Sequence, residues 1–108
     1  MNQSFPKSAR IRTRRQYQRI SQHPTRAIGN WIVVESRQSN NQFTRLGITV
    51  TRRYGNAVRR NRFKRIVREA FRLSRALLPQ GFDLNIKPRT ASYEAKMIDI
   101  LTELKSFI

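Results

Sequence analysis

The chain contains no cysteine, only six acidic residues and no long apolar run. Without cysteine it can form neither a disulfide framework nor a thiolate metal site. Its longest apolar runs, such as Trp31 to Val34, are far shorter than the roughly 20 apolar residues that a membrane helix needs. The first residues, Met1 to Ser8, lack the apolar stretch of a secretory signal peptide. These absences predict a cytoplasmic protein without a membrane partner.

Groups for acid–base or metal catalysis are equally scarce. The single histidine, His23, stands beside Pro24 at a predicted helix end and has no evident partner. Among the acids, only Asp99 and Glu103 have the spacing of neighbours on a helix face. The four glycines form no phosphate-binding motif. The sequence therefore predicts no catalytic residue, no metal site, no cofactor bound by the protein alone and no small-molecule substrate.

Positive charge is what the chain has in excess. Its 23 lysines and arginines against 6 acids give a net charge of +17 over 108 residues, a length that predicts a single domain over residues 1–108. Such a chain repels itself, and a polyphosphate partner would offset the repulsion. Arginine outnumbers lysine, and its planar fork suits phosphates and bases. The composition therefore favours a structured nucleic acid as partner.

The apolar pattern predicts a small α+β domain in which helices pack on a sheet. Alternating apolar residues indicate strands, helical spacing indicates helices, and the polar turn at 37–42 predicts that the first two strands form a hairpin. Pro24 ends the first helix, whereas Asn56 and Ser92 are predicted to cap the later two. The expected order is helix 12–22, strand 31–36, strand 43–51, helix 57–77, strand 82–86 and a last helix from Ser92.

The two longer predicted helices each present one apolar face. The face of the helix over 57–77 consists of Phe63, Ile66, Val67, Ala70, Ser74 and Leu77. The face of the last helix consists of Tyr93, Met97, Ile100, Leu101, Leu104 and Ile108. In the strands, inward positions are predicted at Ile32, Val34, Leu46, Ile48, Val50, Phe82, Leu84 and Ile86.

The helix over 57–77 is basic on its other face. Like charges at helical spacing repel by a few tenths of a kcal/mol per pair, and Glu69 is the single acid available to neutralise them. Arg59 and Arg60 stand at the helix start, where the dipole disfavours cations and free N–H groups favour an anion. Phosphates lying across this face would account for both. The predicted row consists of Asn61, Lys64, Arg65, Arg68, Arg72 and Arg75.

A single-stranded nucleic acid needs aromatic platforms beside cations. Tyr17, Trp31 and Phe43 lie outside the apolar stripes, although Trp31 and Phe43 fit an ordinary core equally well. Neighbouring cations could come from Arg14, Arg52 and Arg53. We therefore predict a cleft for a single strand that is lined by Arg14, Tyr17, Trp31, Phe43, Arg52 and Arg53.

The stretch from Arg52 to Arg72 resembles the signature of the bacterial ribonuclease P protein family, named the RNR motif after its Arg60-Asn61-Arg62 segment. A weaker resemblance covers nearly the whole chain, including the basic-aromatic first helix over 12–20. The further matching positions are Gly47, Gly55-Asn56-Ala57-Val58, Lys64-Arg65, Arg68-Glu69, Phe71-Arg72 and Phe82-Asp83-Leu84. Three features differ from the usual family pattern: Ser21 in place of an aromatic, Asn85 in an apolar strand, and the order Lys87-Pro88-Arg89.

This resemblance implies an α-β-β-β-α-β-α fold with a left-handed βαβ crossover, so a fourth strand is expected near Arg26 to Gly29. It also implies a protein subunit that joins a catalytic RNA and assists removal of the 5′ leader from precursor tRNA, with Mg²⁺ held by the RNA. The leader would lie in the predicted cleft. The residues expected to bind the catalytic RNA are Arg59, Arg60, Asn61, Arg62, Lys64, Arg65, Arg68 and Arg72.

Two other functions are compatible with so basic a chain. A structural ribosomal or general RNA-binding protein would share the charge and the fold, but it usually carries extended basic tails. A DNA-binding helix would need more base-reading side chains than Asn61 and an element for dimerisation. A protein subunit that joins the catalytic RNA therefore remains the leading expectation, and a structural ribosomal or general RNA-binding protein is the alternative.

Overall fold

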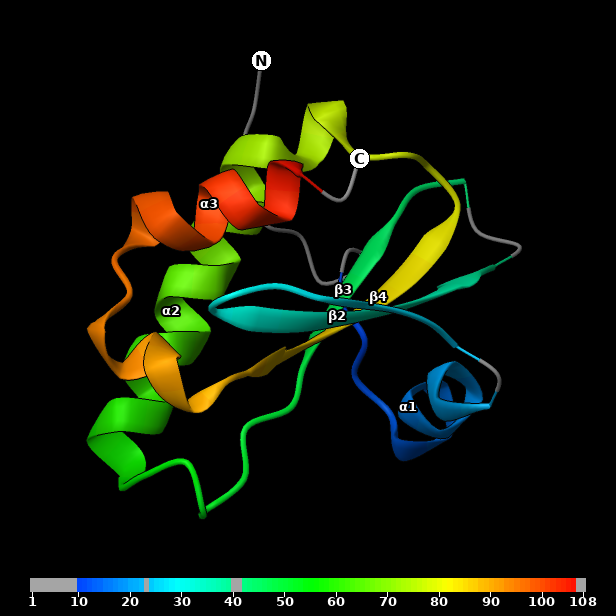
Figure 1. The fold of residues 1–108 in the computed structure, drawn as a ribbon. Coiled ribbons are helices and arrows are strands. Elements are labelled where there is room, and N and C mark those ends of the chain that lie inside the picture. The colour runs from blue at the N-terminus through cyan, green and yellow to red at the C-terminus, as the bar shows by residue number, and fades with distance from the viewer. Residues whose placement is uncertain (1–9, 23, 40–41, 107–108) are drawn as a thin grey trace.

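The computed structural model describes residues 10–22, 24–39 and 42–106, with side chains throughout except at 91 and 92. Our expectations for Met1 to Ser8, His23 and Ile108 fall outside these ranges. The described elements follow the order α-β-β-β-α-β-α, with two short 3-10 helices added (Figure 1). Their bounds are α1 Arg14–Ser21, β1 Thr25–Ile28, β2 Ile32–Gln38, β3 Arg45–Ile48, α2 Ala57–Ser74, η2 Arg75–Leu77, β4 Phe82–Pro88, η3 Thr90–Glu94 and α3 Met97–Lys105.

The strands form one mixed sheet in the order β1-β2-β4-β3. β1 and β4 both run antiparallel to β2, whereas β3 runs parallel to β4. The fourth strand expected near Arg26 to Gly29 is confirmed as β1. The predicted hairpin between the strands now labelled β2 and β3 is wrong, because β4 lies between them. Residues 83–86 of β4 are all buried, so this strand is covered on both faces, as a central strand should be.

One face of the sheet is apolar and is covered by α2 and α3, which also pack against each other (Figure 1). Ile32 and Ile86 are fully buried here, and Phe63 and Phe71 of α2 lie in the same cluster. Burying such side chains is the main favourable term in folding, at roughly 1.5–3 kcal/mol each. The other buried members of this core are Val34, Leu46, Tyr54, Val67, Ala70, Leu78, Leu84, Ala95, Ile100, Leu101 and Leu104.

The predicted apolar face of α2 is largely correct but ends too late. Leu77 is 58% exposed, because the chain tightens after Ser74 into a 3-10 turn that rotates Leu77 outward, and Leu78 is buried instead. Phe71, outside our predicted stripe, is fully buried because α3 widens the covered side of α2. The confirmed members are Phe63, Val67, Ala70 and Ser74, with Ile66 half-buried.

The last helix begins later than predicted. Ser92 does not cap it, since residues Thr90–Glu94 form a 3-10 turn and α3 starts at Met97. The Asp99 carboxylate instead accepts a hydrogen bond from the backbone N–H of Lys96 at 2.8 Å. The predicted apolar face is confirmed at Ile100, Leu101 and Leu104, and Tyr93 and Met97 pack against the core.

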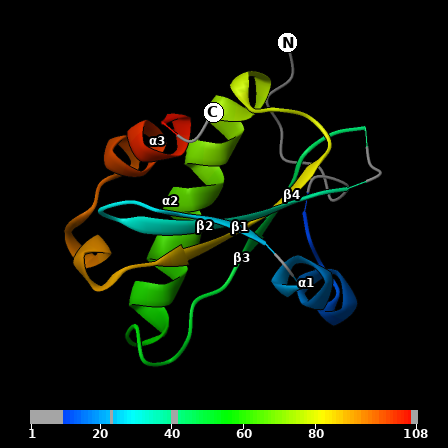
Figure 2. The ribbon, with the colours of Figure 1, turned by 45° about the vertical axis from the view of Figure 1, so that its right-hand side comes forward.

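The first helix, α1, lies on the opposite face of the sheet from α2 and α3 (Figure 2). Thr13 and Gln16 form a capping box that starts it, and Ile20 is its buried side chain. At the other end, the Arg37 guanidinium of β2 donates to the carbonyls of Arg19 and Gln22 at 2.7 and 2.8 Å. These contacts hold α1 against β2.

Candidate nucleic-acid interface

The solvent-facing side of α2 carries a row of cations. Asn56 is confirmed as the N-cap, and its side-chain oxygen accepts the Arg59 N–H at 3.0 Å. With the apolar residues of α2 turned inward, Asn61, Arg65 and Arg68 are exposed on the opposite side. Lys64 is half-buried at the margin of this row. The helix therefore presents a continuous basic face.

Most of this row lacks partners within the described part of the protein. Arg72 and Arg75 are exceptions, since both have interactions within the protein. Arg72 forms an ion pair with Glu69, and its hydrogen bond lowers the pKa of the Glu69 carboxyl. The remaining side chains of the row repel one another, and an external anion would remove that cost. The members of the row whose side chains make no hydrogen bond or ion pair with any described residue are Asn61, Lys64, Arg65 and Arg68, and the same is true of the neighbouring Arg60 side chain.

Two arginines of the RNR region have contacts within the protein. The Arg62 guanidinium donates to the carbonyl oxygens of Ala95 at 2.8 Å and Tyr93 at 3.5 Å. The Arg59 guanidinium lies 4.5 Å from the centre of the Tyr93 ring, a cation–π contact. Both hold the η3 segment against the start of α2. The sequence could not reveal this role, because the partners, the Tyr93 ring and backbone carbonyls of residues 93 and 95, belong to a distant segment.

Arg10 is a basic residue that our site prediction missed. It pairs with Leu46 in an isolated parallel bridge, which carries the segment before α1 along the outer edge of β3. There it lines a hollow together with the middle of the α2 row. The other residues lining this hollow are Asn61, Arg65, Arg68, Glu69 and Arg72.

Tyr17 reaches the same edge of the sheet from α1. Its hydroxyl oxygen accepts the Ile48 N–H at 3.2 Å, and its ring lies over Gly47, where an added Cβ would come within 2.7 Å of Tyr17 Cε1. Glycine at 47 is therefore what admits the ring. Tyr17, Lys64 and Arg68 line one hollow, so the predicted aromatic of the cleft faces the predicted cations of α2 across β3.

The other predicted cleft residues do not gather in that hollow. Trp31 packs against the core, and Phe43 is 38% exposed just before β3. Arg53 lies near the C-terminal ends of β3 and β4, in a hollow that it lines with Lys87 and Tyr93. Arg14 on α1 and Arg52 after β3 are exposed. Of the six predicted cleft residues, Tyr17 is therefore the one that lines the hollow beside α2.

Beneath α1 the sheet carries a layer of charged side chains. Burial alone would raise the pKa of the Glu35 carboxyl, but hydrogen bonds from Lys87 and Arg26, with their charges, leave that pKa below its usual value. Arg45 donates two hydrogen bonds of 2.8 Å to Asp83. Each of these two buried acids is thus matched by a cation.

Asn85, one of the departures from the family pattern, belongs to the same layer. It is 6% exposed, and its side-chain oxygen accepts a hydrogen bond from the Thr49 hydroxyl at 3.0 Å. Its polar group is therefore satisfied without disturbing β4. Ser21, another departure, is exposed and donates to the Gln18 carbonyl at the end of α1.

The acid pair at helical spacing, Asp99 and Glu103, is used for structure. Besides the capping role of Asp99, the Glu103 carboxylate accepts the backbone N–H groups of Asn30, Trp31 and Ile32 at 2.8 to 3.1 Å. It thereby closes the turn between β1 and β2. Among the described residues, no group of three or more His, Cys, Asp or Glu side chains could hold a metal ion.

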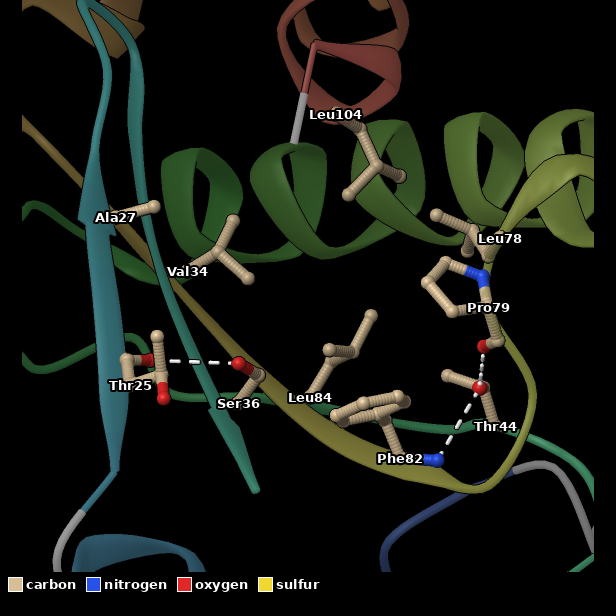
Figure 3. Close-up of a pocket in the computed structure, with 10 residues that line it drawn as sticks. All are labelled: Thr25, Ala27, Val34, Ser36, Thr44, Leu78, Pro79, Phe82, Leu84 and Leu104. Carbon is tan, nitrogen blue, oxygen red and sulfur yellow. Dashed lines mark hydrogen bonds between the residues drawn. The ribbon is translucent and has the colours of Figure 1, made fainter. Parts of the chain in front are cut away.

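A separate hollow of about 190 Å³ lies on the other side of the sheet, between β1, β2, the end of α3 and the turn before β4 (Figure 3). Val34, Leu84 and Leu104 line it, and the Thr44 hydroxyl at its rim donates to the Pro79 carbonyl. This apolar lining lacks the cations that phosphates need.

In the part of the chain that the structure describes, no helix is long and apolar enough to cross a membrane.

Fold and surface together define a class: a small α+β protein whose basic helix face is suited to a nucleic acid. The family model described as Ribonuclease P matches residues 5–108, and the chain belongs to this family. Members of the family are the protein component of ribonuclease P, a ribonucleoprotein endoribonuclease.

Individual relatives agree with this assignment. The "Ribonuclease P protein component" of Thermotoga maritima is 38% identical over 103 residues, covering 94% of this chain and 88% of the relative. That of Syntrophus aciditrophicus is 40% identical over 101 residues, covering 94% and 85%. Among solved structures, the Thermotoga maritima RNase P protein superposes with a TM-score of 0.83 at 32% identity, covering 91% of this chain and 93% of that one. The Staphylococcus aureus RNase P protein gives 0.82 at 28% identity, covering 93% and 92%.

Proposed function

We propose that this chain docks on the catalytic RNA of ribonuclease P through α2 and holds the 5′ leader of precursor tRNA beside Tyr17. The observation that carries the proposal is a group of cations on α2 whose side chains have no partner among the described residues, in a chain of net charge +17. These cations are Arg60, Lys64, Arg65 and Arg68. The RNA subunit cleaves the bond between leader and mature tRNA, with Mg²⁺ that the RNA holds. The protein contributes positive charge and affinity for the substrate.

Docking would use the phosphates of the catalytic RNA. Arg65 and Arg68 are the exposed centre of the row, and each guanidinium can bind a phosphate with two hydrogen bonds. Arg62 has five N–H donors, so it can hold η3 and still face the RNA. Arg59 and Arg72 flank the row, and their contacts with Tyr93 and Glu69 hold them in place.

The leader would be held mainly by stacking. An aromatic ring binds an unpaired base with about 1–3 kcal/mol, whatever the base. The Tyr17 ring is fixed over Gly47 and lines a hollow with Lys64 and Arg68, so a base on the ring and a phosphate on these cations could be bound together. Tyr17 therefore links the leader to the docking surface.

The experiment that tests the proposal is a reconstitution. Purified protein is mixed with a bacterial ribonuclease P RNA and precursor tRNA at low Mg²⁺, where the RNA alone is slow. Accurate 5′ cleavage that requires both components is the expected result. Tight RNA binding without stimulation of cleavage would contradict the proposal and favour a structural ribosomal or general RNA-binding role.

The docking surface is tested with Arg65→Ala/Arg68→Ala. This variant should bind the catalytic RNA more weakly, and the slope of log K against log salt should fall by roughly 0.7–0.9 for each phosphate that the variant no longer neutralises. Lys96→Ala/Lys105→Ala removes the same charge from exposed positions on or beside α3 and is the matched control. An equal change of slope in both variants would show that α2 contributes only net charge, and would contradict its role as the docking surface.

The leader site is tested with Tyr17→Ala. It should weaken binding of leader-bearing precursor by roughly tenfold and leave mature tRNA unaffected, because it removes about 1–3 kcal/mol of stacking. Tyr17→Phe keeps the ring and loses the hydroxyl that accepts the Ile48 N–H, so it should retain most of the affinity. Equal losses for precursor and mature tRNA would rule out binding of the leader at Tyr17.

A further inference from the structure

The outward side of α1 is a second basic surface, separate from α2. Arg12, Arg14, Arg15 and Arg19 are all exposed, and none of their side chains bonds to a residue that the structure describes. No acid occurs in the chain before Glu35, so the helix has no neutralising neighbour of its own. An anionic partner would offset the repulsion among these arginines.

Packing does not explain these arginines. The inner side of α1 is formed by Ile20, which is 1% exposed, and by Tyr17 over Gly47. Arg14 and Arg15 stand in the first turn, where the helix dipole disfavours cations, and Arg15 repels Arg19 one turn further on. Each effect costs a few tenths of a kcal/mol or more, and a bound anion would offset them all.

The spacing suits the backbone of a strand. Arg15 and Arg19 are one turn apart, about 6 Å along the helix axis, and Arg12 is exposed just ahead of the N-cap Thr13. These three arginines can meet two or three consecutive phosphates. The guanidinium groups would bind these phosphates with two hydrogen bonds each, and such contacts do not depend on the base sequence.

The position of the row separates it from the docking surface. α1 and α2 lie on opposite faces of the sheet (Figures 1 and 2). Arg15 and Arg19 are exposed and lie away from the buried Ile20 on α1, so they face solvent and not the sheet. An RNA lying along α2 is therefore on the other side of the molecule. One end of a leader held at Tyr17 must run toward that RNA, so its 5′ end leaves on the α1 side.

We infer that Arg12, Arg15 and Arg19 bind phosphates of the 5′-distal part of the leader, beyond the segment held at Tyr17. This inference rests on the proposed function and extends it. The contact depends on leader length and not on leader sequence. It adds affinity only for a leader long enough to pass from Tyr17 over α1.

The test measures the affinity of the reconstituted protein–RNA complex for precursors with a series of leader lengths, from about 4 to about 20 nucleotides of mixed sequence. Wild type should bind long leaders several-fold more tightly than short ones. Arg15→Ala/Arg19→Ala should lose that gain and match wild type on short leaders. Arg15→Lys/Arg19→Lys should restore part of it, and Lys96→Ala/Lys105→Ala should keep it.

The outcomes separate the two proposals. No stimulation of cleavage by the wild type would overturn both of them. Stimulated cleavage with no gain from leader length, or with a gain that survives in Arg15→Ala/Arg19→Ala, would overturn the distal contact alone. An equal loss on short and long leaders would also overturn it, because the row would then touch the tRNA body or the catalytic RNA. A thermal melt within a few degrees of wild type shows that the variant is folded.

Discussion

The two faces of the sheet use the same strands in opposite ways. Toward α2 and α3, β2 and β4 present Val34 and Ile86 to the apolar core, whereas toward α1 they present Glu35 and Asp83, equally buried. Buried ion pairs recover little more than their desolvation cost, so the apolar face supplies most of the stability. The polar face contributes little stability, and in our proposal it lies on the side of the sheet where Tyr17 holds the leader. One sheet thus combines a side that stabilises the fold with a side that we propose for binding.

The largest expected loss comes from the apolar face. Phe71→Ala should lower the free energy of unfolding by about 3–5 kcal/mol, because it leaves a cavity in the apolar core. Leu77→Ala is the control, since Leu77 is 58% exposed and should change stability by less than about 1 kcal/mol. Urea unfolding measures both, and similar losses would show that the core is not where we place it.

On the polar face, Asp83→Ala should cost about 3 kcal/mol, because it leaves the half-buried Arg45 without its two hydrogen bonds to that carboxylate. The double variant Arg45→Met/Asp83→Leu should recover most of this loss in the same urea experiment. Recovery would show that the pair is retained for something other than stability. A double variant as unstable as Asp83→Ala would instead make the ion pair a net stabiliser.

Gly47→Ala tests the contact that positions α1 over β3. The new Cβ would come within 2.7 Å of Tyr17 Cε1, so the ring must move, at about 1–3 kcal/mol of unfolding free energy and with weaker leader binding. Gly55→Ala is the matched control for stability, because the three atoms nearest its new Cβ, at 2.9 to 3.6 Å, all belong to the exposed Arg59 side chain, which can give way. Precursor affinity and urea unfolding are measured together. Unchanged values for Gly47→Ala would contradict the proposed ring position.

The smallest effect concerns pH. The folded-state pKa of Glu35 lies below its ordinary value of 4.5, so its ionised form stabilises the fold at higher pH. This contribution is lost as pH falls through the folded-state pKa. Unfolding free energies measured between about pH 6 and pH 3 should therefore fall by about 1 kcal/mol more in wild type than in Glu35→Gln. Parallel curves would show that the ion pairs with Lys87 and Arg26 contribute nothing.

The parts of the fold that the sequence predicts well are those encoded locally. The period of α2, its Asn56 cap and the basic side of the helix are all set by neighbours within a few residues, and the structure has each of them. Strand pairing depends on contacts between distant segments, so the expected hairpin is wrong although β2 and β3 themselves are present. The 3-10 turn over Thr90–Glu94 escapes prediction because Tyr93 continues the helical apolar spacing.

The features of the site that the sequence does not predict also depend on contacts between distant segments. Alternation along β2 and β4 suggests that Glu35, Asp83 and Asn85 face water, yet α1 and cations from neighbouring strands cover them. The sequence predicts Arg62 as an RNA-binding cation, and in the structure backbone carbonyls of residues 93 and 95 occupy part of its guanidinium. Burial and backbone acceptors become visible only once distant segments are placed together.

The strand order has a consequence for how the chain folds. β4 is the last of the four strands to be synthesised, yet it lies between β2 and β3, so the sheet cannot be completed in the order in which the chain is made. Until residues 82–88 arrive, β3 lacks its partner strand, and its unpaired edge is exposed to other chains. Pairings of this kind close long loops and are intrinsically slow. Insertion of β4 should therefore be the step that limits folding, after α2 has formed from local contacts.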